Sequence, residues 1–393
     1  MKKHILFIVE NNSFPKDVRV RNEAIAAFEY GYDVSVICPV NKKTDKKFEQ
    51  INGIDVYRHP MPIEAYNKWG FIVEYANALF WETLLSIRVY IKKRFHAIHA
   101  ANPPDHVFLI ALPYKLFGVK YIFDHHDICP ENYFAKFNRK DFLYRVMFAM
   151  EKLTFITADL VISTNESYKK IAISRGNKKD GDVFVVRNGP DMNKIRKMCP
   201  NEMLRDGFKY LVGYVGIIAQ QEGIDNLLEI VDYLVNKRNI TYIKFIIIGT
   251  GPYWKHLVQL SKSKGVDRYV VFTGYIPDEE LHQILSTVDL CVNPEFGNEF
   301  TDKSTMIKIM EYMTFGKPII QFYTTEGEVT AQNAAYYIRE NSKELFAQAI
   351  IELLDNPQKR NEMGQFGLKR IEEVLSWQIQ KQNLMKAYRS VIH

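Results

Sequence analysis

Short apolar runs alternate with helical patterns along the whole chain. In the first half, the runs of strand length are HILFIVE, DVSVICP, HAIHA, YIFDHH, LVISTN and VFVVRN. In the second half they are YLVGYVG, KFIIIG, YVVFTG, LCVNP and PIIQF, each followed by a helical segment. Apolar strands separated by helices are typical of a parallel sheet that helices cover on both faces. The pattern predicts two doubly wound α/β units in tandem, with a cleft between them.

Turn residues mark the expected division of the chain, which has 393 residues and enough apolar content, 47%, for two cores. The turn sequence Asn188-Gly189-Pro190-Asp191 follows the last strand of the first unit. We therefore expect one Rossmann-like domain over residues 1–187 and a second over residues 188–375. Residues 376–393 are predicted to form a final helix with aromatic and basic residues.

Positive charge is concentrated in the first half. The net charge is +6; by count, residues 1–190 contain 28 Lys and Arg against 21 Asp and Glu, and the remainder contains 24 against 25. The excess predicts contact between the first half and something anionic, such as a phospholipid surface or a phosphate-linked acceptor. Solvated lysines that keep the protein soluble are the alternative. The basic residues are scattered without a recognition motif, which disfavours nucleic acid.

Two segments mix aromatic and basic residues, residues 66–94 and residues 134–145. This mixture suits an interfacial membrane site, with core packing as the alternative for the aromatic residues. No apolar run approaches the roughly 20 residues of a membrane span. The apolar run at residues 5–9 is too short for a secretion signal. The four cysteines lack metal-ligand and disulfide spacing. We expect a cytoplasmic protein whose membrane contact, if it has any, is peripheral.

Residues 244–318 contain the most informative motifs, in the order KFIIIGTGP, VVFTG, STVDLCVNPE and STMIKIMEYMTFGKP. The strand-length run ends at Gly249-Thr250-Gly251, where missing Cβ atoms let a turn come close to a ligand. Further on, Ser304 and Thr305 are expected to cap a helix that carries Lys308 and Glu311 on one face. Free N–H groups at such a helix start, beside a cation, suit a diphosphate.

In order and spacing these motifs resemble the nucleotide-sugar half of family 4 of the glycosyltransferases, which have the GT-B fold. The resemblance extends over nearly the whole chain, because the first half contains PKDVRVRNEAIAAFEYGYDVSVICP, FDHHDICPE, ADLVISTNES and VVRNGPD in the family's order. It implies two Rossmann-like domains facing a cleft. It also implies a retaining transfer of sugar from a nucleoside-diphosphate donor, without a metal ion or other cofactor.

The resemblance assigns the donor side to the second domain. It implies that Glu311 accepts hydrogen bonds from the donor ribose hydroxyls, with a surface glutamate as the alternative. Lys308, or in second place Lys303, would stabilise charge on the leaving diphosphate. The remaining expected donor contacts are Gly216, Gly249, Gly251, Ser304, Thr305 and Asn188. For Gly216, the glycine after the first strand of the second domain, an ordinary role in the turn is the alternative.

Two departures from the family pattern concern charge. The family places an Arg and a Lys in the loop after the first strand of the second domain, where this chain has Ile217 and Glu222. The family also often has a second glutamate eight positions before the one at 311, where this chain has Lys303. We expect that the phosphate-binding cation has moved to Lys303 or Lys308. An inactive donor site is the competing hypothesis.

The resemblance assigns the acceptor side to the first domain. His126 aligns with the family histidine that meets the transferred sugar; His125 is the adjacent alternative, and one of the pair is expected to be structural. Asp17, Arg19 and Arg21 are candidate contacts to acceptor phosphate or sugar, with surface ion pairs as the alternative. Glu131 is either an acceptor contact or a helix-start charge. The chain has no DxD element in a metal-binding setting and no histidine pair with ligand spacing.

The expected reaction is transfer of a sugar, with an N-acetylhexosamine preferred, from a UDP-sugar to a saccharide or lipid-linked saccharide in surface-polysaccharide synthesis. The preference for UDP and for this sugar rests on the same resemblance. One alternative is a GDP-mannose-dependent mannosyltransferase. Another is a non-catalytic GT-B subunit that binds saccharide, which the missing cations at Ile217 and Glu222 would permit.

Overall fold

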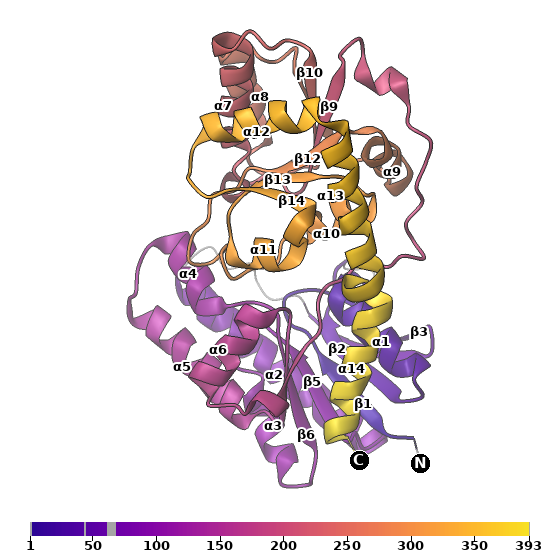
Figure 1. The fold of residues 1–393 in the computed structure, drawn as a ribbon. Helices are drawn as coiled ribbons and strands as arrows, with labels where there is room; N and C mark the ends of the chain where they lie inside the picture. The colour runs from indigo at the N-terminus through magenta and orange to yellow at the C-terminus, as the bar shows by residue number, and fades with distance from the viewer. Residues whose placement is uncertain (1, 43–44, 61–67, 393) are drawn as a thin grey trace. The chain divides into compact units, whose positions relative to one another are not determined.

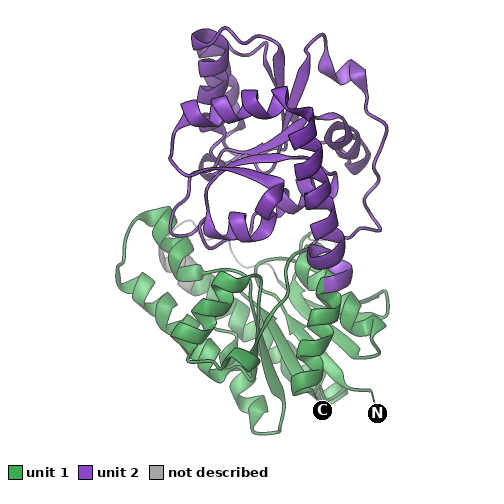
Figure 2. Ribbon diagram, viewed as in Figure 1, with its two compact units in different colours: residues 1–188, 380–393 green, residues 189–379 purple. Residues whose placement is uncertain are grey.

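The computed structural model of the protein describes residues 2–42, 45–60 and 68–392, with the backbone alone described for residues 68–72. The chain divides into two compact units, one of residues 1–188 and 380–393 and the other of residues 189–379 (Figure 2). The domain ends expected from the sequence, residues 187 and 375, lie one and four residues before these divisions.

Unit 1 contains an eight-stranded sheet in the order β3-β4-β2-β1-β5-β6-β7-β8 (Figure 1). Neighbouring strands are parallel except for β3, which pairs antiparallel with β4. This hairpin was not predicted from the sequence. The strands are β1 (His4–Ile8), β2 (Asp33–Pro39), β3 (Phe48–Ile51), β4 (Ile54–His59), β5 (Ala97–Ala101), β6 (Lys120–His125), β7 (Leu160–Ser163) and β8 (Val183–Val185).

Helices connect the strands of unit 1. They are α1 (Val18–Glu29), α2 (Lys68–Lys92), α3 (Phe108–Lys115), α4 (Cys129–Phe137), α5 (Phe142–Thr157) and α6 (Glu166–Gly176), followed at the C-terminus by α14 (Trp377–Val391). The crossovers through α2, α3, α5 and α6 run in one direction across the sheet, and the crossover through α1 runs in the other. Right-handed connections therefore place α2, α3, α5 and α6 on one face and α1 on the opposite face. Among the described residues, no helix combines the length and apolar character needed to cross a bilayer.

Unit 2 contains a six-stranded sheet in the order β11-β10-β9-β12-β13-β14, with every pair parallel. The last strand was not predicted from the sequence. The strands are β9 (Tyr210–Val215), β10 (Ile243–Ile248), β11 (Val270–Gly274), β12 (Leu290–Asn293), β13 (Ile319–Phe322) and β14 (Ala335–Ile338). The helices are α7 (Ile224–Asp232), α8 (Trp254–Ser263), α9 (Asp278–Thr287), α10 (Ile307–Thr314), α11 (Thr325–Ala331), α12 (Lys343–Asp355) and α13 (Pro357–Arg370).

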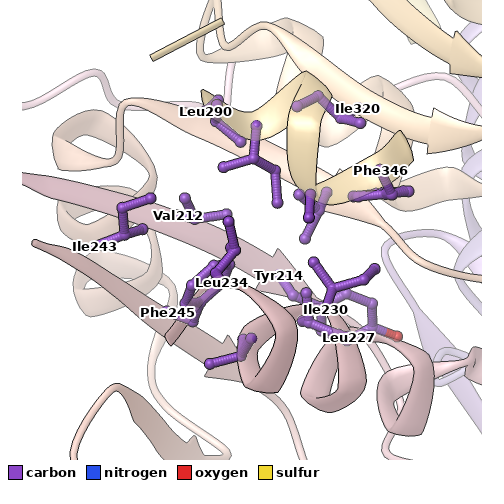
Figure 3. Packing of buried hydrophobic residues seen from close by; sticks show 14 of the residues in the cluster. Val212, Tyr214, Leu227, Ile230, Leu234, Ile243, Phe245, Leu290, Ile320 and Phe346 are labelled. Carbon is purple, nitrogen blue, oxygen red and sulfur yellow. The ribbon is translucent and has the colours of Figure 1, made fainter. Parts of the chain in front are cut away.

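One hydrophobic core of unit 2 lies between the sheet and its covering helices. Val212, Phe245 and Leu290 extend from three neighbouring strands toward Leu227 of α7 and Phe346 of α12 (Figure 3). All five side chains are buried. This packing fixes the strand ends from which the loops of the candidate site emerge.

Both sheets have a topological switch point. In unit 2 the chain proceeds from β9 outward to β11 and then returns to β12 on the other side of β9. In unit 1 the corresponding neighbours are β1 and β5. Loops that leave two such neighbouring strands diverge, so the carboxyl edge at a switch point is the preferred ligand site of doubly wound sheets. A ligand site is therefore expected beyond the ends of β9 and β12 in unit 2 and beyond the ends of β1, β5 and β6 in unit 1.

Candidate functional site

The loops that follow β9 and β10 approach each other backbone to backbone. A Cβ atom on Gly249 would lie 1.8 Å from the carbonyl oxygen of Gly216, and one on Gly251 would lie 2.3 Å from that of Ile218. Gly249 also has φ of +132°, which residues with a side chain rarely adopt. The sequence suggested that the missing Cβ atoms of these glycines let the turn come close to a ligand. In the structure they let it come close to the backbone of the neighbouring loop.

Lys308 lies at the switch point of unit 2 and is neutralised there. Its Nζ is 2.5 Å from Oε2 of Glu222 and donates to the hydroxyl of Tyr214 at 3.1 Å. The Tyr214 hydroxyl in turn donates to Oε2 of Glu222 at 3.1 Å. A Cβ atom on Gly216 would come within 3.4 Å of Cε of Lys308, so the glycine leaves room for the lysine chain. Lys308, Glu222 and Tyr214 are called the lysine cluster below.

The lysine cluster joins one position that departs from the family pattern of charge, Glu222, to Lys308, a candidate for the moved cation. Glu222 ends a 3₁₀ turn (Gln220–Glu222) in the loop after β9, and Lys308 lies in the first turn of α10. The cation that the resemblance expects in the loop after β9 is therefore replaced by a carboxylate, and a cation on α10 bonds to that carboxylate. This placement is what the hypothesis of a moved cation requires. Lys303, the other candidate, lies in a turn before α10.

Two further carboxyl groups lie near the lysine cluster. Glu311 is half-buried one turn after Lys308, and burial raises the pKa of its carboxyl while the charge of Lys308 opposes the shift. Glu295 is the second residue after β12 and is 5% exposed. Burial raises the pKa of Glu295 to about 7, Lys308 acts to lower it, and Glu222 acts to raise it. Sequence reasoning missed Glu295, although a carboxylate two residues after a buried strand was a usable signal.

The predicted cap of the helix that carries Lys308 is wrong. Helix α10 begins at Ile307 with Met306 as its N-cap residue, and no side chain caps it. Ser304 instead donates its hydroxyl to the carbonyl of Phe300 at 2.9 Å, and its backbone N–H donates to the carbonyl of Thr301. A local turn of residues 300–304 competes with the helix for these groups. Ser304 and Thr305 thus lie before α10 rather than at its first turn.

His126 follows β6 at the carboxyl edge of unit 1, where Asn102 fixes its backbone. The side-chain oxygen of Asn102 accepts hydrogen bonds from the backbone N–H groups of His126 at 2.8 Å and Asp127 at 3.0 Å. Its amide nitrogen donates to Oδ1 of Asp105 and to the carbonyl of Asp127. The ring of His126 is half-buried. Asn102, which follows β5, was not found by sequence reasoning.

His125 is the structural member of the histidine pair, as expected for one of the two. It is fully buried, and its ring stacks on Phe123 and meets Phe155 edge to face. Neither ring nitrogen has a hydrogen-bond partner among the described residues. Burial lowers the pKa of His125 to about 3, so the ring is neutral at physiological pH.

Arg19 lies inside unit 1 rather than at an acceptor surface. Its guanidinium donates to both carboxylate oxygens of Asp124, at 2.7 and 2.5 Å, to the carbonyl of Val186 and to Oδ1 of Asn188, and it lies 3.1 Å from Glu23. These contacts are four hydrogen bonds and one ion pair, so the guanidinium is engaged inside unit 1. The predictions that Arg19 binds acceptor and that the side chain of Asn188 binds donor are therefore corrected: these groups bond to each other.

His99 and Tyr388 complete this interior network, called the arginine cluster below. His99 Nε2 lies 3.2 Å from Glu23 and 3.7 Å from Asp124, and Nδ1 bonds to the hydroxyl of Tyr388 on α14 at 2.8 Å. Burial acts to lower the pKa of His99, but hydrogen bonds to Asp124 and Glu23 and their charges raise it to about 9. Glu23, His99 and Asp124 are close enough to share a metal ion. The guanidinium of Arg19 already supplies positive charge to both carboxylates.

The remaining acceptor candidates have local roles in the structure. Asp17 is the N-cap residue of α1, where its side chain accepts from the backbone N–H of Val20 at 2.9 Å. Arg21 is half-buried on the first turn of that helix. Glu131 is buried in the first turn of α4 and forms an ion pair with Arg175. The sequence left two interpretations of Glu131 open, an acceptor contact and a helix-start charge. The structure adds a third role, a buried ion pair.

Two family models match the chain on either side of the division between the units. The model described as glycosyl transferase 4-like domain matches residues 18–189, and the model described as glycosyl transferases group 1 matches residues 209–356. The protein belongs to the family 4 glycosyltransferases. The resemblance found in the sequence is thereby confirmed.

Curated relatives of this glycosyltransferase are distant. Glycosyltransferase MJ1069 of Methanocaldococcus jannaschii is 22% identical over 62% of this chain and 61% of its own length. The capsular polysaccharide biosynthesis glycosyltransferase CapM of Staphylococcus aureus is 24% identical over 64% of this chain and 67% of its own length. A GDP-mannose-dependent phosphatidylinositol monomannoside mannosyltransferase of Corynebacterium glutamicum is 24% identical over 44% of this chain and 45% of its own length.

Solved structures show the fold. The sucrose-phosphate synthase of Thermosynechococcus elongatus superposes with a TM-score of 0.78 at 17% identity and covers 99% of both chains. The Anabaena protein HepE, in complex with UDP, superposes with a TM-score of 0.74 at 15% identity, covering 99% of this chain and 100% of its own. The fold of the glycosyltransferase is GT-B, as predicted.

Proposed function

We propose that the protein transfers a sugar, with retention of anomeric configuration, from a nucleoside-diphosphate donor to a saccharide or lipid-linked saccharide acceptor. The observation that carries the proposal is the lysine cluster at the switch point of unit 2. A buried ammonium group lies there beside the loop glycines, one helical turn from a carboxylate at 311. That arrangement has the two functions a sugar nucleotide requires, a cation for the diphosphate and an acceptor for hydroxyls.

Lys308 is proposed to stabilise the leaving group. When the bond between the anomeric carbon and the diphosphate oxygen breaks, its electrons remain on that oxygen and negative charge develops. A fixed cation in a site with little water lowers the free energy of that state more than it would in solution. Because Lys308 is only 8% exposed and held by Tyr214, its position is fixed before the donor arrives. The proposal assigns no step to a metal ion.

Glu222 is proposed to exchange places with the donor. In the structure it is the carboxylate that neutralises Lys308. A diphosphate that bonds to Lys308 must take over this charge, because two anions on one ammonium group repel each other. The carboxylate lies in the loop after β9 and is more exposed than the lysine, 18% against 9% by side chain. We therefore infer that Glu222 holds Lys308 in place in the free enzyme and yields when the donor binds.

Glu311 and His126 are proposed to position the two parts of the donor. A carboxylate can accept from two adjacent ribose hydroxyls at once, which suits Glu311. His126 is presented at the carboxyl edge of unit 1 by Asn102, and its ring is the proposed contact to the transferred sugar. The hydrogen bond from the backbone N–H of His126 to Asn102 orients the His126 backbone and does not involve the His126 ring.

The donor is proposed to be a UDP-sugar, with an N-acetylhexosamine preferred. In support, the fold resembles HepE, whose structure contains UDP. The name of CapM supports an acceptor in surface-polysaccharide synthesis. The name of the mannosyltransferase relative favours GDP-mannose as the second candidate donor. A non-catalytic GT-B subunit remains the third candidate because Glu222 occupies the position of a family cation.

A panel of sugar nucleotides separates these candidates. Hydrolysis or transfer would be measured with UDP-, GDP- and ADP-sugars, and we expect activity with the UDP-sugars. Activity confined to GDP-mannose would identify GDP-mannose as the donor in place of a UDP-sugar. Binding without turnover for every donor would favour the non-catalytic subunit over an enzyme. As an internal test, Lys308→Ala should lower kcat by about 10²–10³-fold, because a transition-state charge contact is lost. Ile217→Ala, in the adjoining loop, should leave it within about twofold.

A further inference from the structure

The outer face of three neighbouring helices in unit 1 is apolar. Helix α2 packs against α3, and α3 packs against α5, on the same side of the sheet (Figure 1). Large apolar side chains point away from the core along all three helices, with exposed fractions from 42% to 87%. They are Phe80, Leu84, Ile87 and Ile91 on α2, Leu109, Leu112, Leu116 and Phe117 on and after α3, and Leu153 and Ile156 on α5. These residues are called the apolar face below.

The spacing along α2 shows that the face is continuous. Phe80, Leu84, Ile87 and Ile91 are separated by four, three and four residues, so they form one stripe on the helix. The stripe lies opposite the buried residues of the same helix, which include Glu82 and Val89. A helix that covers a sheet in water normally has polar residues on its outer side. The outer side of α2 is apolar instead.

Charge on and around the apolar face is positive. The exposed charged residues on α2 and α5 are Arg88, Lys92, Arg145 and Lys152. The carboxylates of Glu82 and Glu151 point inward and are buried, and α3 contains no acidic residue. Over the described part of these three helices, no fully exposed carboxylate accompanies the apolar residues. Glu74 on α2 is half-buried and Lys92 lies 3.8 Å from Asp55, so the face combines apolar surface with an excess of exposed cations.

A cavity at the end of the apolar face is also lined by cations. Its volume is about 290 Å³, and Tyr90 and Arg94 at the end of α2 line it together with Phe117 of the apolar face. Lys3 and Lys120 complete its basic lining, and no side-chain carboxylate of the described residues lines it. Aromatic walls with ammonium and guanidinium groups suit a phosphate group attached to an apolar chain.

We propose that unit 1 docks onto a bilayer that contains anionic phospholipid through the apolar face, with a lipid headgroup in the basic cavity. Apolar side chains that lie flat on one surface, bordered by Lys and Arg, are the features of interfacial membrane binding. Charge complementarity favours a lipid surface over a second copy of the chain, because two such faces would bring like charges together. The inference deepens the proposed function, since a lipid-linked acceptor would be found at the same surface, but it does not depend on sugar transfer.

The apolar face overlaps in part with the segments that the sequence suggested: its α2 residues lie within residues 66–94, and its α3 and α5 residues lie outside both segments. Residues 66–94 were predicted to contact membrane through their aromatic residues, of which residue 66 and the side chains at 69 and 71 lie outside the described part of the structure. In α2 the aliphatic residues Leu84, Ile87 and Ile91 contribute as much to the face as Phe80 does. In the second segment, Lys140 lies over the ring of Phe134 at 4.7 Å, and Phe142 is 76% exposed at the start of α5.

Vesicle co-sedimentation of the full chain tests the proposal. The vesicles would contain either phosphatidylcholine alone or an equal mixture with phosphatidylglycerol. The test variant is Ile91→Glu/Leu116→Glu, at residues 80% and 87% exposed, and the matched control is Met203→Glu/Tyr275→Glu, at residues 84% and 82% exposed in unit 2. Both variants add two negative charges. We expect the mixed vesicles to bind wild type and control, and to bind the test variant at least tenfold less.

Two readouts keep the outcomes distinct. Equal binding of test variant and control, or binding of wild type to phosphatidylcholine as strongly as to the mixture, would overturn the proposal. Light scattering that shows a wild-type dimer and a monomeric test variant, without vesicle binding by either, would overturn it in favour of a second copy. Thermal shift with UDP should be the same for wild type and the test variant. If UDP does not raise the melting temperature of wild type, that result would count against the proposed function but would not affect the docking result.

Discussion

Two buried cations, Arg19 in unit 1 and Lys308 in unit 2, differ in how completely the protein satisfies them. Both are almost fully buried, and each bonds to a carboxylate. Arg19 donates four hydrogen bonds to protein acceptors, and Asp124 accepts two of them. Lys308 has one carboxylate partner, and that partner, Glu222, lies on a loop.

The pKa values of two carboxyl groups near these cations also differ: that of Asp124 is lowered, and that of Glu295 is raised. In the arginine cluster, burial acts to raise the pKa of Asp124, but the charge of Arg19 and hydrogen bonds from His99 and Arg19 hold it well below its usual value. Beside the lysine cluster, burial raises the pKa of Glu295 to about 7, and one of its oxygens has no hydrogen-bond partner among the described residues. Burial also raises the pKa of Glu23 in the arginine cluster, and neither of its carboxylate oxygens has a hydrogen-bond partner among the described residues. The two clusters therefore differ in the number of partners of the cation, and not in whether every carboxylate is satisfied. Burial of a cation therefore does not by itself identify a site.

Replacing Arg19 should produce the largest effect. Arg19→Met leaves Asp124 and Glu23 as uncompensated buried charges, which costs about 3–5 kcal/mol of unfolding free energy. Arg21→Met, two residues further along α1 and half-buried, should cost less than about 0.5 kcal/mol. Urea unfolding followed by circular dichroism measures both. Equal stability of the two variants would show that the buried contacts of Arg19 do not stabilise unit 1.

Removing Glu311 should weaken donor binding without affecting the fold. Glu311→Ala loses hydrogen bonds from a charged group to the ribose, which should cost about 1.5–3 kcal/mol of binding free energy. Glu352→Ala, at an exposed position on α12, is the control and should bind as wild type does. Calorimetric titration with the nucleotide measures the difference. Unchanged affinity in a folded Glu311→Ala variant would remove this residue from the donor site.

The pH dependence of stability should expose the buried carboxyl group beside the lysine cluster. The pKa of Glu295 is raised from 4.5 to about 7, so the folded state holds this proton more tightly than the unfolded state does. Its contribution to stability is present below pH 4.5 and is lost as the pH rises through about 7. Glu295→Gln should therefore be more stable than wild type at pH 8, by on the order of 1–2 kcal/mol, and similar to it at pH 4.5. A variant that is less stable at pH 8 would mean that the Glu295 carboxylate has a partner.

The smallest effect is expected at the junction between α14 and the arginine cluster. Tyr388→Phe removes the hydrogen bond to Nδ1 of His99 and should lower the unfolding free energy by about 1 kcal/mol. The pKa of His99 is raised to about 9, so the contribution of its charged ring is complete below pH 6.5 and is lost as the pH rises through 9. The same urea unfolding at pH 7 gives the size of the effect. No change on removing the hydroxyl would separate α14 from the cluster.

The sequence predicted the parts of the fold that depend on local pattern. Apolar strands such as residues 243–248 are buried along their whole length, so their pattern is unambiguous. The β3–β4 hairpin was missed because β3 alternates exposed and half-buried residues at the edge of the sheet, although the turn Asn52-Gly53 was a signal for it. The start of α10 was misplaced because Ser304 forms a local turn, a choice that capping preference alone does not settle.

Partners distant in the sequence explain the rest. Arg19 and Asp124 are 105 residues apart, and Lys308 and Glu222 are 86 apart. Both cations were therefore candidate phosphate contacts, Lys308 as the first choice for the diphosphate and Arg19 with an ion pair as the alternative, until their neighbours were known. Asn102 was missed for the same reason, because it acts on a turn 24 residues away. The resemblance to the family identified the fold and the class of enzyme, and the structure identified which charges are already satisfied.

The lysine cluster as a donor site is the central claim, and titration of nucleoside diphosphate against two variants tests it most directly. UDP would be used, with GDP and ADP alongside, against wild type, Lys308→Ala and Glu222→Gln. If the diphosphate replaces Glu222 on Lys308, Lys308→Ala should weaken binding at least about tenfold, or 1.4 kcal/mol, whereas Glu222→Gln should tighten it because the competing charge is gone. Opposite signs for the two variants are the predicted result. Weaker binding in both, or no change in either, would contradict the claim and leave Lys308 and Glu222 as a structural ion pair.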